Sequence, residues 1–198
     1  MFKEPDEDAL NTQQFNYMKN YINTLETVLY DDDLFSSRIY ENYLDINSFI
    51  DWWLVHELTN NGEPNHPKSS YMHKDKLGKL KAGPVWDFDY GTFTPSSSTT
   101  GLYIANSLYY DKLFQDTEFK TKVKERWTLL KTELLNISTF IEDEKTKLLK
   151  SADINIRLWP ISSRVNGDET LNFKEAVERL KTSFNTRMQV LDNNINNM

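Results

Sequence analysis

The sequence predicts a mainly α-helical fold with one small β-hairpin. Apolar residues recur at helical spacing before residue 60 and again after residue 115, and two short runs between them flank a turn-rich tetrapeptide. The chain has 198 residues, of which 38% are hydrophobic and 13% aromatic. Because this is enough apolar material for one sizeable core and not clearly enough for two, we expect residues 1–198 to form a single domain.

Two helices are expected in the first third of the chain. The first begins after Asn11, where Asn11 and Gln14 are placed like an N-cap and its third-position partner, and ends near the run of three aspartates at 31–33. The second begins at Asp45 or Asn47 and is stopped by Asn60-Asn61-Gly62. The apolar faces consist of Met18, Tyr21, Ile22, Leu25, Val28 and Leu29 in the first helix, and of Phe49, Ile50, Trp53, Leu54 and Leu58 in the second.

A β-hairpin is expected next, after a loop at residues 63–67 that contains two prolines. Residues 70–74 and 79–85 read as its strands, and Asp75-Lys76-Leu77-Gly78 as its turn. The second strand leads directly into Trp86-Asp87-Phe88-Asp89. Because side chains alternate along a strand, Asp87 and Asp89 should point to opposite sides unless the backbone turns there, and only one of them would then face a given pocket.

Helical patterns resume after a small polar stretch at residues 94–101, which we expect to be a loop. Asp116 precedes the first of them. The three apolar stripes consist of Phe119, Val123, Trp127 and Leu130, then of Phe140, Ile141, Leu148 and Leu149, and finally of Phe173, Val177, Leu180, Phe184, Leu191 and Ile195.

The bulk composition excludes several classes of function. The formal net charge is -7 and the pI is near 5.0, so no broad basic face is available for a nucleic acid, and we expect none as a partner. Without cysteine, the chain has no disulfide, thiolate nucleophile or cysteine zinc site. No apolar run approaches the roughly 20 residues needed to span a membrane, and the acidic start is unlike a signal peptide, so we expect a soluble chain as given.

The middle of the chain has the order of a kinase catalytic loop followed by its metal-binding aspartate: a helix, a polar loop with an acidic residue, a hairpin and an acidic turn. This order brings Glu63 and Asp87 to the same end of the hairpin. Phosphoryl transfer uses one carboxylate to orient the attacking hydroxyl and another to hold the metal that bridges the phosphates. Mg²⁺ prefers such oxygen ligands, and commonly takes one or two protein carboxylates together with phosphate oxygens.

Several stretches resemble the CotH kinase family. The resemblance extends from about Leu25 to the C-terminus, and its most specific part is Trp86-Asp87-Phe88-Asp89. The stretches that resemble the family are Glu57-Leu58-Thr59-Asn60-Asn61-Gly62-Glu63, Pro67-Lys68-Ser69-Ser70-Tyr71-Met72, Gly78-Lys79-Leu80-Lys81-Ala82-Gly83-Pro84-Val85-Trp86-Asp87-Phe88-Asp89 and Tyr110-Asp111-Lys112-Leu113-Phe114-Gln115-Asp116, with Phe119 and Arg126-Trp127 beyond them.

The resemblance implies the C-terminal-lobe-like portion of an atypical protein-kinase-like fold. CotH proteins are bacterial kinases, known in spore-coat assembly and in surface or secreted proteins, that use ATP and Mg²⁺ or Mn²⁺ to phosphorylate Ser or Thr of a protein acceptor. Carried over, Asp87 matches the metal-binding aspartate, with Asp89 beside it, and Glu63 stands where the family usually has a catalytic aspartate. Besides these catalytic and metal residues, we assign Asn61, Lys68 and Ser70 to cofactor binding.

A kinase also needs a glycine-rich cover over the phosphates and a lysine on a preceding sheet. The first glycine here is Gly62, so we expect the N-terminal nucleotide-binding part to be absent and this chain alone to be inactive. Two alternatives stay open: a catalytically degenerate CotH-like binding or structural surface protein, and a glycan-active carboxylate enzyme.

Overall fold

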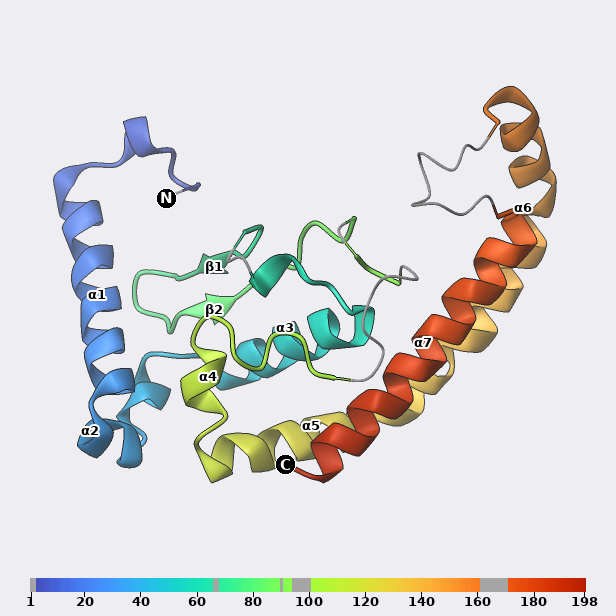
Figure 1. The fold of residues 1–198 in the computed structure, drawn as a ribbon. Coiled ribbons are helices and arrows are strands. Elements are labelled where there is room, and N and C mark those ends of the chain that lie inside the picture. The colour runs from blue at the N-terminus through green and yellow to red at the C-terminus, as the bar shows by residue number, and fades with distance from the viewer. Residues whose placement is uncertain (1–2, 66–67, 90, 94–100, 161–170) are drawn as a thin grey trace. The chain divides into compact units, whose positions relative to one another are not determined.

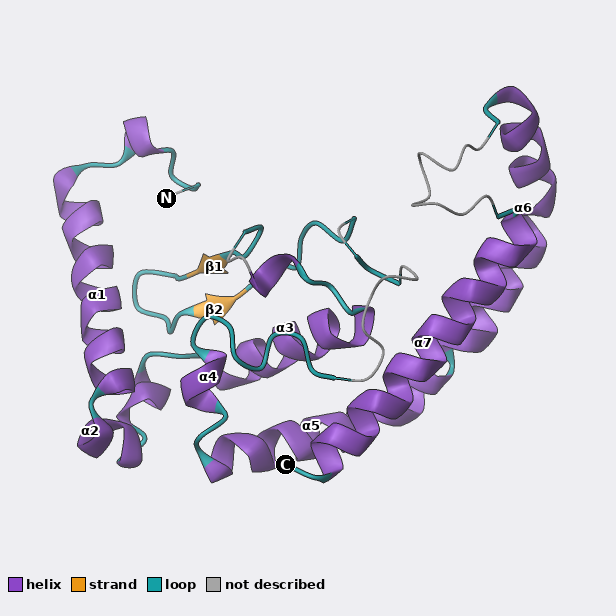
Figure 2. Ribbon diagram, in the orientation of Figure 1, coloured by secondary structure: helices purple, strands orange, loops and turns teal. Residues whose placement is uncertain are grey.

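The computed structural model describes residues 3–65, 68–89, 91–93, 101–160 and 171–198. Helices account for most of these residues, and two short strands form a small sheet (Figure 2). The predicted fold class, mainly α with a small β-hairpin, is confirmed. The contacts divide the chain into two compact units, residues 1–46 with 73–81 and residues 47–72 with 82–198. The single domain expected for residues 1–198 stays a prediction.

The first unit is built around α1 (Thr12–Tyr30), with η1 (Glu7–Ala9), α2 (Asp32–Ser36) and η2 (Ile39–Asn42). The predicted capping box is present, since the Asn11 side chain accepts from the Gln14 backbone N–H and the Gln14 side chain accepts from that of Asn11. Asp31 ends α1 and caps α2 in turn, accepting from two backbone N–H groups. The buried apolar residues of this unit are Leu25, Val28, Leu29, Tyr40, Leu44 and Leu80.

The second unit contains α3 (Ile46–Thr59, from its second residue on), η3 (Glu63–Asn65), α4 (Tyr110–Leu113), α5 (Thr117–Leu135), α6 (Ile137–Leu158) and α7 (Phe173–Asn196). The core of this unit lies on α3, where Trp53 is fully buried with its ring 4.9 Å from that of Phe114. Asp116, which precedes the predicted stripe, caps α5 and accepts from the backbone N–H of Glu118 at 2.8 Å. The predicted stripes of α5 and α7 contribute Phe119, Val123, Trp127, Phe184, Leu191 and Ile195 to the buried core.

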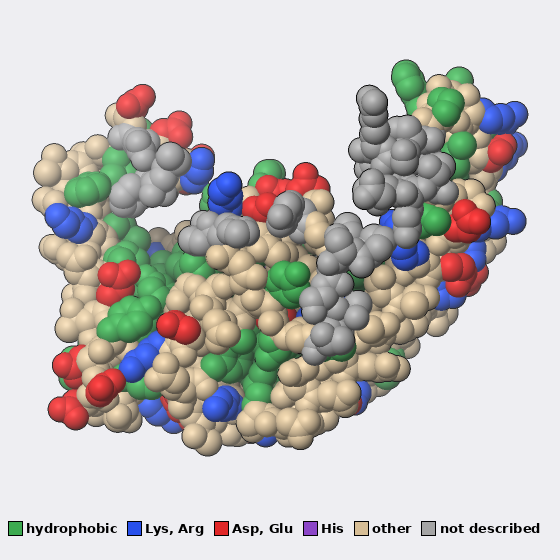
Figure 3. Space-filling view, viewed as in Figure 1, with side chains coloured by type: hydrophobic (Ala, Val, Ile, Leu, Met, Phe, Trp, Pro, Cys, Tyr) green, Lys and Arg blue, Asp and Glu red, His purple; other side chains and the backbone are tan. Residues whose placement is uncertain are grey.

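Two long helices, α6 and α7, run side by side, and α7 also packs against α5 (Figure 1). Lys145 of α6 reaches a carboxylate oxygen of Glu178 at 2.6 Å, and Lys181 of α7 reaches one of Glu142 at 2.8 Å, so ion pairs join the two helices. On the face of these helices drawn in Figure 3, basic and acidic side chains are interspersed rather than gathered by sign. The stripe predicted for α6 is only partly covered, since Phe140 is 60% exposed and no residue of α6 is buried.

The hairpin is shorter than the sequence predicts. Its strands are β1 (Met72–His73) and β2 (Lys81–Ala82), and the turn between them contains Gly78, whose N–H donates to Asp75 O at 3.0 Å. Residues 83–89 form no strand, although residues 79–85 were expected to. Gly83 has φ +118° and Asp87 has φ +63°, which are conformations that a strand does not contain. Most of the predicted loop at 94–101, and residues 66–67 of the proline loop, lie outside the described residues.

Candidate functional site

The C-terminal end of α3 places the first site residues. Asn60 adopts φ +56°, the Asn61 N–H donates to His56 O at 3.0 Å, and the Asn60 N–H donates to Glu57 O at 3.2 Å. This is the hydrogen-bond pattern of a Schellman motif, in which a left-handed residue ends the helix. Asparagine tolerates that conformation better than most residues, so the predicted stop at residues 60–62 is confirmed.

Asn61 is fully buried and joins three segments through its side chain. Its Nδ2 donates to Asp87 O at 2.9 Å and lies 3.2 Å from His56 Nδ1. Its Oδ1 accepts from the Glu63 N–H at 3.1 Å. The side chain of Asn61 therefore ties the end of α3 to η3 and to the turn that carries Asp87.

Asp87 and Asp89 do not point apart as a strand would require. Because Asp87 has a positive φ, the backbone turns at that residue and brings the two carboxyl groups within hydrogen-bond reach of each other. The hydrogen bond with Asp87 raises the pKa of Asp89 above its ordinary value, and repulsion between the two charges acts in the same direction. Asp87 Oδ2 also accepts from Ser69 Oγ at 2.9 Å. The backbone turns at Asp87, which is the exception that the expectation allowed, and both carboxylates lie at one place.

The other predicted site residues are Glu63, Lys68 and Ser70, and their described hydrogen bonds go to backbone groups or to Asn61. Glu63 is half-buried in η3, and its connection to the turn runs through its own N–H and Asn61. Lys68 is exposed, and its carbonyl oxygen accepts from Ser70 Oγ at 3.1 Å. The serine that reaches Asp87 is thus Ser69, while Ser70 turns back to the residue before it.

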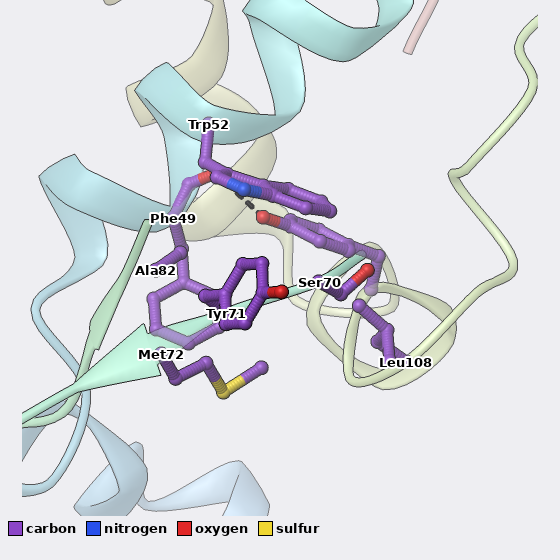
Figure 4. Close-up of a pocket in the computed structure, with 8 residues that line it drawn as sticks. Phe49, Trp52, Ser70, Tyr71, Met72, Ala82 and Leu108 are labelled. Atoms are coloured by element: carbon purple, nitrogen blue, oxygen red, sulfur yellow. Dashed lines mark hydrogen bonds between the residues drawn. The ribbon is translucent and has the colours of Figure 1, made fainter. Parts of the chain in front are cut away.

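Ser70 also lines an apolar crease between α3 and the hairpin strands (Figure 4). The Tyr110 hydroxyl donates to Phe49 O at 2.8 Å, and the Tyr110 ring stacks on that of Trp52 with their centroids 5.8 Å apart. The crease is too tight for a water molecule, so in this structure it is packed core rather than a nucleotide pocket. It is lined by Phe49, Trp52, Ser70, Tyr71, Met72, Ala82, Leu108 and Tyr110.

Three residues to which the sequence analysis gave no role in the site lie next to it. Ser69 binds Asp87, and His56 contacts Asn61 and stacks on Phe88 with ring centroids 5.2 Å apart. Trp86, next to Asp87, is 59% exposed and meets Tyr71 edge-on. A lone histidine in a helical pattern carries no signal of such contacts, because they depend on a segment about 30 residues further along the chain.

A buried ion pair supports the same end of α3. Arg187 of α7 donates to Glu57 O at 2.9 Å from Nε, and its Nη2 lies 3.2 Å from Glu57 Oε2. Glu57 in turn accepts from the backbone N–H groups of Tyr103 and Ile104 at 2.8 Å and 2.7 Å. Both charged side chains are at most 1% exposed, and burial raises the pKa of Glu57. The pair fixes the helix turn that precedes Asn60 and Asn61.

The donor set of the turn fits a hard divalent cation. Asp87 and Asp89 offer two adjacent carboxylates. Mg²⁺ commonly takes one or two protein carboxylates, and phosphate oxygens and water complete its coordination. Among the described residues, no group of three or more His, Asp or Glu side chains is arranged to hold a metal by itself. The turn is therefore suited to a cation that arrives with a phosphate ligand, rather than to a closed structural site.

Comparison with known proteins identifies the family. The family model described as CotH kinase protein matches residues 1–191, which extends the similarity toward the N-terminus beyond Leu25. Neither a search of curated proteins nor one of solved structures found a match. In the described part of the chain, every helix is too short or too polar to cross a membrane. With its Trp86-Asp87-Phe88-Asp89 turn and a match over nearly its whole length, this chain belongs to the CotH kinase family.

Proposed function

We propose that this chain supplies the metal-binding side of an ATP-dependent Ser/Thr phosphotransferase. Membership of the CotH family makes a kinase-like function the expectation at family level. The observation that supports the finer proposal is the turn at Asp87, where two carboxyl groups lie within hydrogen-bond reach of each other. Asp87 and Asp89 would hold Mg²⁺ or Mn²⁺, and the bound cation would supply positive charge that neutralises charge on the transferred phosphoryl group.

The residues of this chain have distinct parts in the proposal. Asp87 and Asp89 would hold the cation, and Ser69 and Asn61 would orient Asp87 through its carboxylate and its carbonyl oxygen. Glu63, held near the turn through Asn61, would orient the hydroxyl of the acceptor. We keep Lys68 and Ser70 as proposed contacts of the nucleotide.

The test measures transfer of labelled phosphate from ATP to a Ser-containing protein, with Mg²⁺ or Mn²⁺, by the full-length protein to which this chain belongs. Asp87→Asn keeps the size of the side chain and removes its charge, so we expect transfer to fall by about 100-fold or more. Asp143→Asn, on the exposed surface of α6, is the matched control and should leave transfer unchanged. Equal transfer by wild type and Asp87→Asn would refute the role of Asp87.

A catalytically degenerate member is the second candidate, and the glutamate at position 63 favours it. Glu63 is one methylene longer than the aspartate expected there by resemblance, and a displacement of about 1 Å can cost roughly 100-fold in rate. If the full-length wild type binds Mn²⁺ but transfers no phosphate, and Glu63→Asp restores transfer, then the protein is a catalytically degenerate member of the family.

A further inference from the structure

His56 lies inside an aromatic cluster at the end of α3. Its ring centroid is 4.1 Å from that of Trp52 and 5.2 Å from that of Phe88, and the planes of His56 and Phe88 are within 10° of parallel. The side chain is only 1% exposed. Phe88 lies between Asp87 and Asp89 in the sequence, so the imidazole packs against the residue that links the two carboxylates of the candidate metal site.

The hydrogen bonding of His56 fixes its tautomer. An amide nitrogen can only donate, so Asn61 Nδ2, at 3.2 Å, donates to His56 Nδ1, and the ring proton is on Nε2. Burial lowers the pKa of His56 from 6.5 to about 4, which keeps the ring neutral and Nδ1 available as an acceptor at neutral pH. Within the described part of the chain, Nε2 makes no hydrogen bond.

Two routes thus run from His56 to the turn. One passes through Asn61, whose Nδ2 also donates to Asp87 O at 2.9 Å. The other is the ring stack on Phe88. They hold Asp87 and Phe88, which are joined by a single peptide bond. Asp87 has φ +63°, a conformation that residues other than glycine rarely adopt. Contacts on both sides of that bond are what a strained turn needs to persist.

We infer that His56 is a positioning residue for the candidate metal site: through Asn61 and Phe88 it holds the turn in the conformation in which Asp87 and Asp89 present their carboxylates together. The inference rests on the proposed function in so far as that site binds a divalent cation. His56 itself touches neither carboxylate in any contact described here, and acts on them only through its neighbours.

Two substitutions separate the routes. His56→Phe keeps an aromatic ring against Trp52 and Phe88 but gives Asn61 no acceptor, and it removes the Nε2 donor that has no partner. His56→Asn places an amide oxygen close to where Nδ1 was, and so keeps the acceptor, but loses the ring. Tyr110→Phe is the control, because it removes a buried hydrogen bond from the same aromatic cluster without touching Asn61.

The first readout is the affinity of the chain for Mn²⁺, measured by electron paramagnetic resonance, alongside the melting temperature. Loss of a residue that orients a ligand typically lowers metal affinity 10- to 100-fold, so we expect about a 10-fold loss in His56→Phe and a smaller loss in His56→Asn. The melting temperatures should rank in the opposite order, since phenylalanine fills the buried site better. Tyr110→Phe should bind Mn²⁺ like the wild type. A purely structural role predicts that affinity follows stability, and that result would overturn the inference.

The second readout is the amide NMR spectrum of the metal-free chain. In His56→Phe the signals of Asp87, Phe88, Asp89 and the Asn61 side chain should shift, whereas Tyr110→Phe should leave them in place. Unchanged signals in His56→Phe would overturn the inference whatever the metal data show. If wild type and Asp87→Asn bind Mn²⁺ equally poorly, the proposed function fails instead, and the NMR result alone then decides whether His56 sets the turn.

Discussion

The strongest influences on the pKa of Asp89 come from its neighbour Asp87. The hydrogen bond and the charge of that neighbour raise its pKa, so the pair takes up a proton at a higher pH than a single carboxyl group would. Protons therefore compete with a cation at this turn, and the outcome of the competition depends on both residues.

We predict that the pH at which half of the Mn²⁺ binding is lost is higher in the wild type than in Asp89→Asn. The variant should bind more weakly near neutral pH, because one carboxylate is gone, and its remaining binding should persist to lower pH, because the carboxyl group with the raised pKa has been removed. Mn²⁺ titrations between about pH 4 and pH 7 would measure both quantities. A midpoint that does not move would show that the two carboxyl groups titrate independently.

His56 gives a second dependence on pH, this time of stability. Because burial lowers its pKa from 6.5 to about 4, the unfolded chain takes up a proton as the pH falls through 6.5 while the folded chain does not. The contribution of His56 to stability is therefore complete above pH 6.5 and is lost as the pH falls toward 4. Relative to His56→Phe, the free energy of unfolding of the wild type should fall by about 2 kcal/mol over this range in urea denaturation. Parallel pH profiles would show that His56 is not buried in its neutral form.

Residue types in the site could be read from the sequence, but their geometry could not. The acidic turn was located at Asp87 because aspartates beside a glycine, after a hairpin and a polar loop, suit a metal that binds phosphate. That Asp89 lies beside it depends on the positive φ of Asp87, for which aspartate in a Trp-Asp-Phe-Asp run gives no warning. Ser69 rather than Ser70 reaches Asp87 for a similar reason, since Ser69 also has a positive φ, of 52°.

At the level of elements, the helices with strong apolar periodicity and a capping residue were predicted closely. The capping box at Asn11 and the cap at Asp116 start α1 and α5, and Asn60 ends α3. The short helices α2 and α4 were missed because four or five residues do not establish a period. The second strand was predicted too long, because the apolar and β-branched residues before Trp86 fit a strand, while the backbone from Gly83 onward does not.

The ion pair between Arg187 of α7 and Glu57 of α3 leads to a prediction about the free energy of unfolding. Arg187→Met would remove every hydrogen bond that the guanidinium makes to Glu57 and Gly101, and would leave the Glu57 carboxylate buried without its cation. We expect the free energy of unfolding to fall by about 3–5 kcal/mol in urea denaturation.

The control for this prediction is Arg157→Met on α6, whose ion pair with Asp153 is exposed on both sides, so its loss should cost less than about 1 kcal/mol. A small effect at both positions would mean that Arg187 does not support the end of α3.

For the whole molecule, the composition bears on what the chain can bind alone. No glycine precedes Gly62, so the sequence before the site offers no glycine-rich loop for phosphates. We therefore expect a saturating mixture of ATP and Mg²⁺ to raise the melting temperature of this chain by no more than about 1 °C. A rise of several degrees, lost in Asp87→Asn, would place the main nucleotide contacts within these residues.

The contact between Arg187 and Glu57 joins residues that are 130 positions apart, and this separation has a consequence for biosynthesis. At translation rates of about 5–20 residues per second, on the order of ten seconds pass between the synthesis of the two residues. During that interval the end of α3 lacks the guanidinium that neutralises Glu57 in the folded chain. The turn with Asp87 is made early in translation, yet its support is completed only when one of the last helices leaves the ribosome.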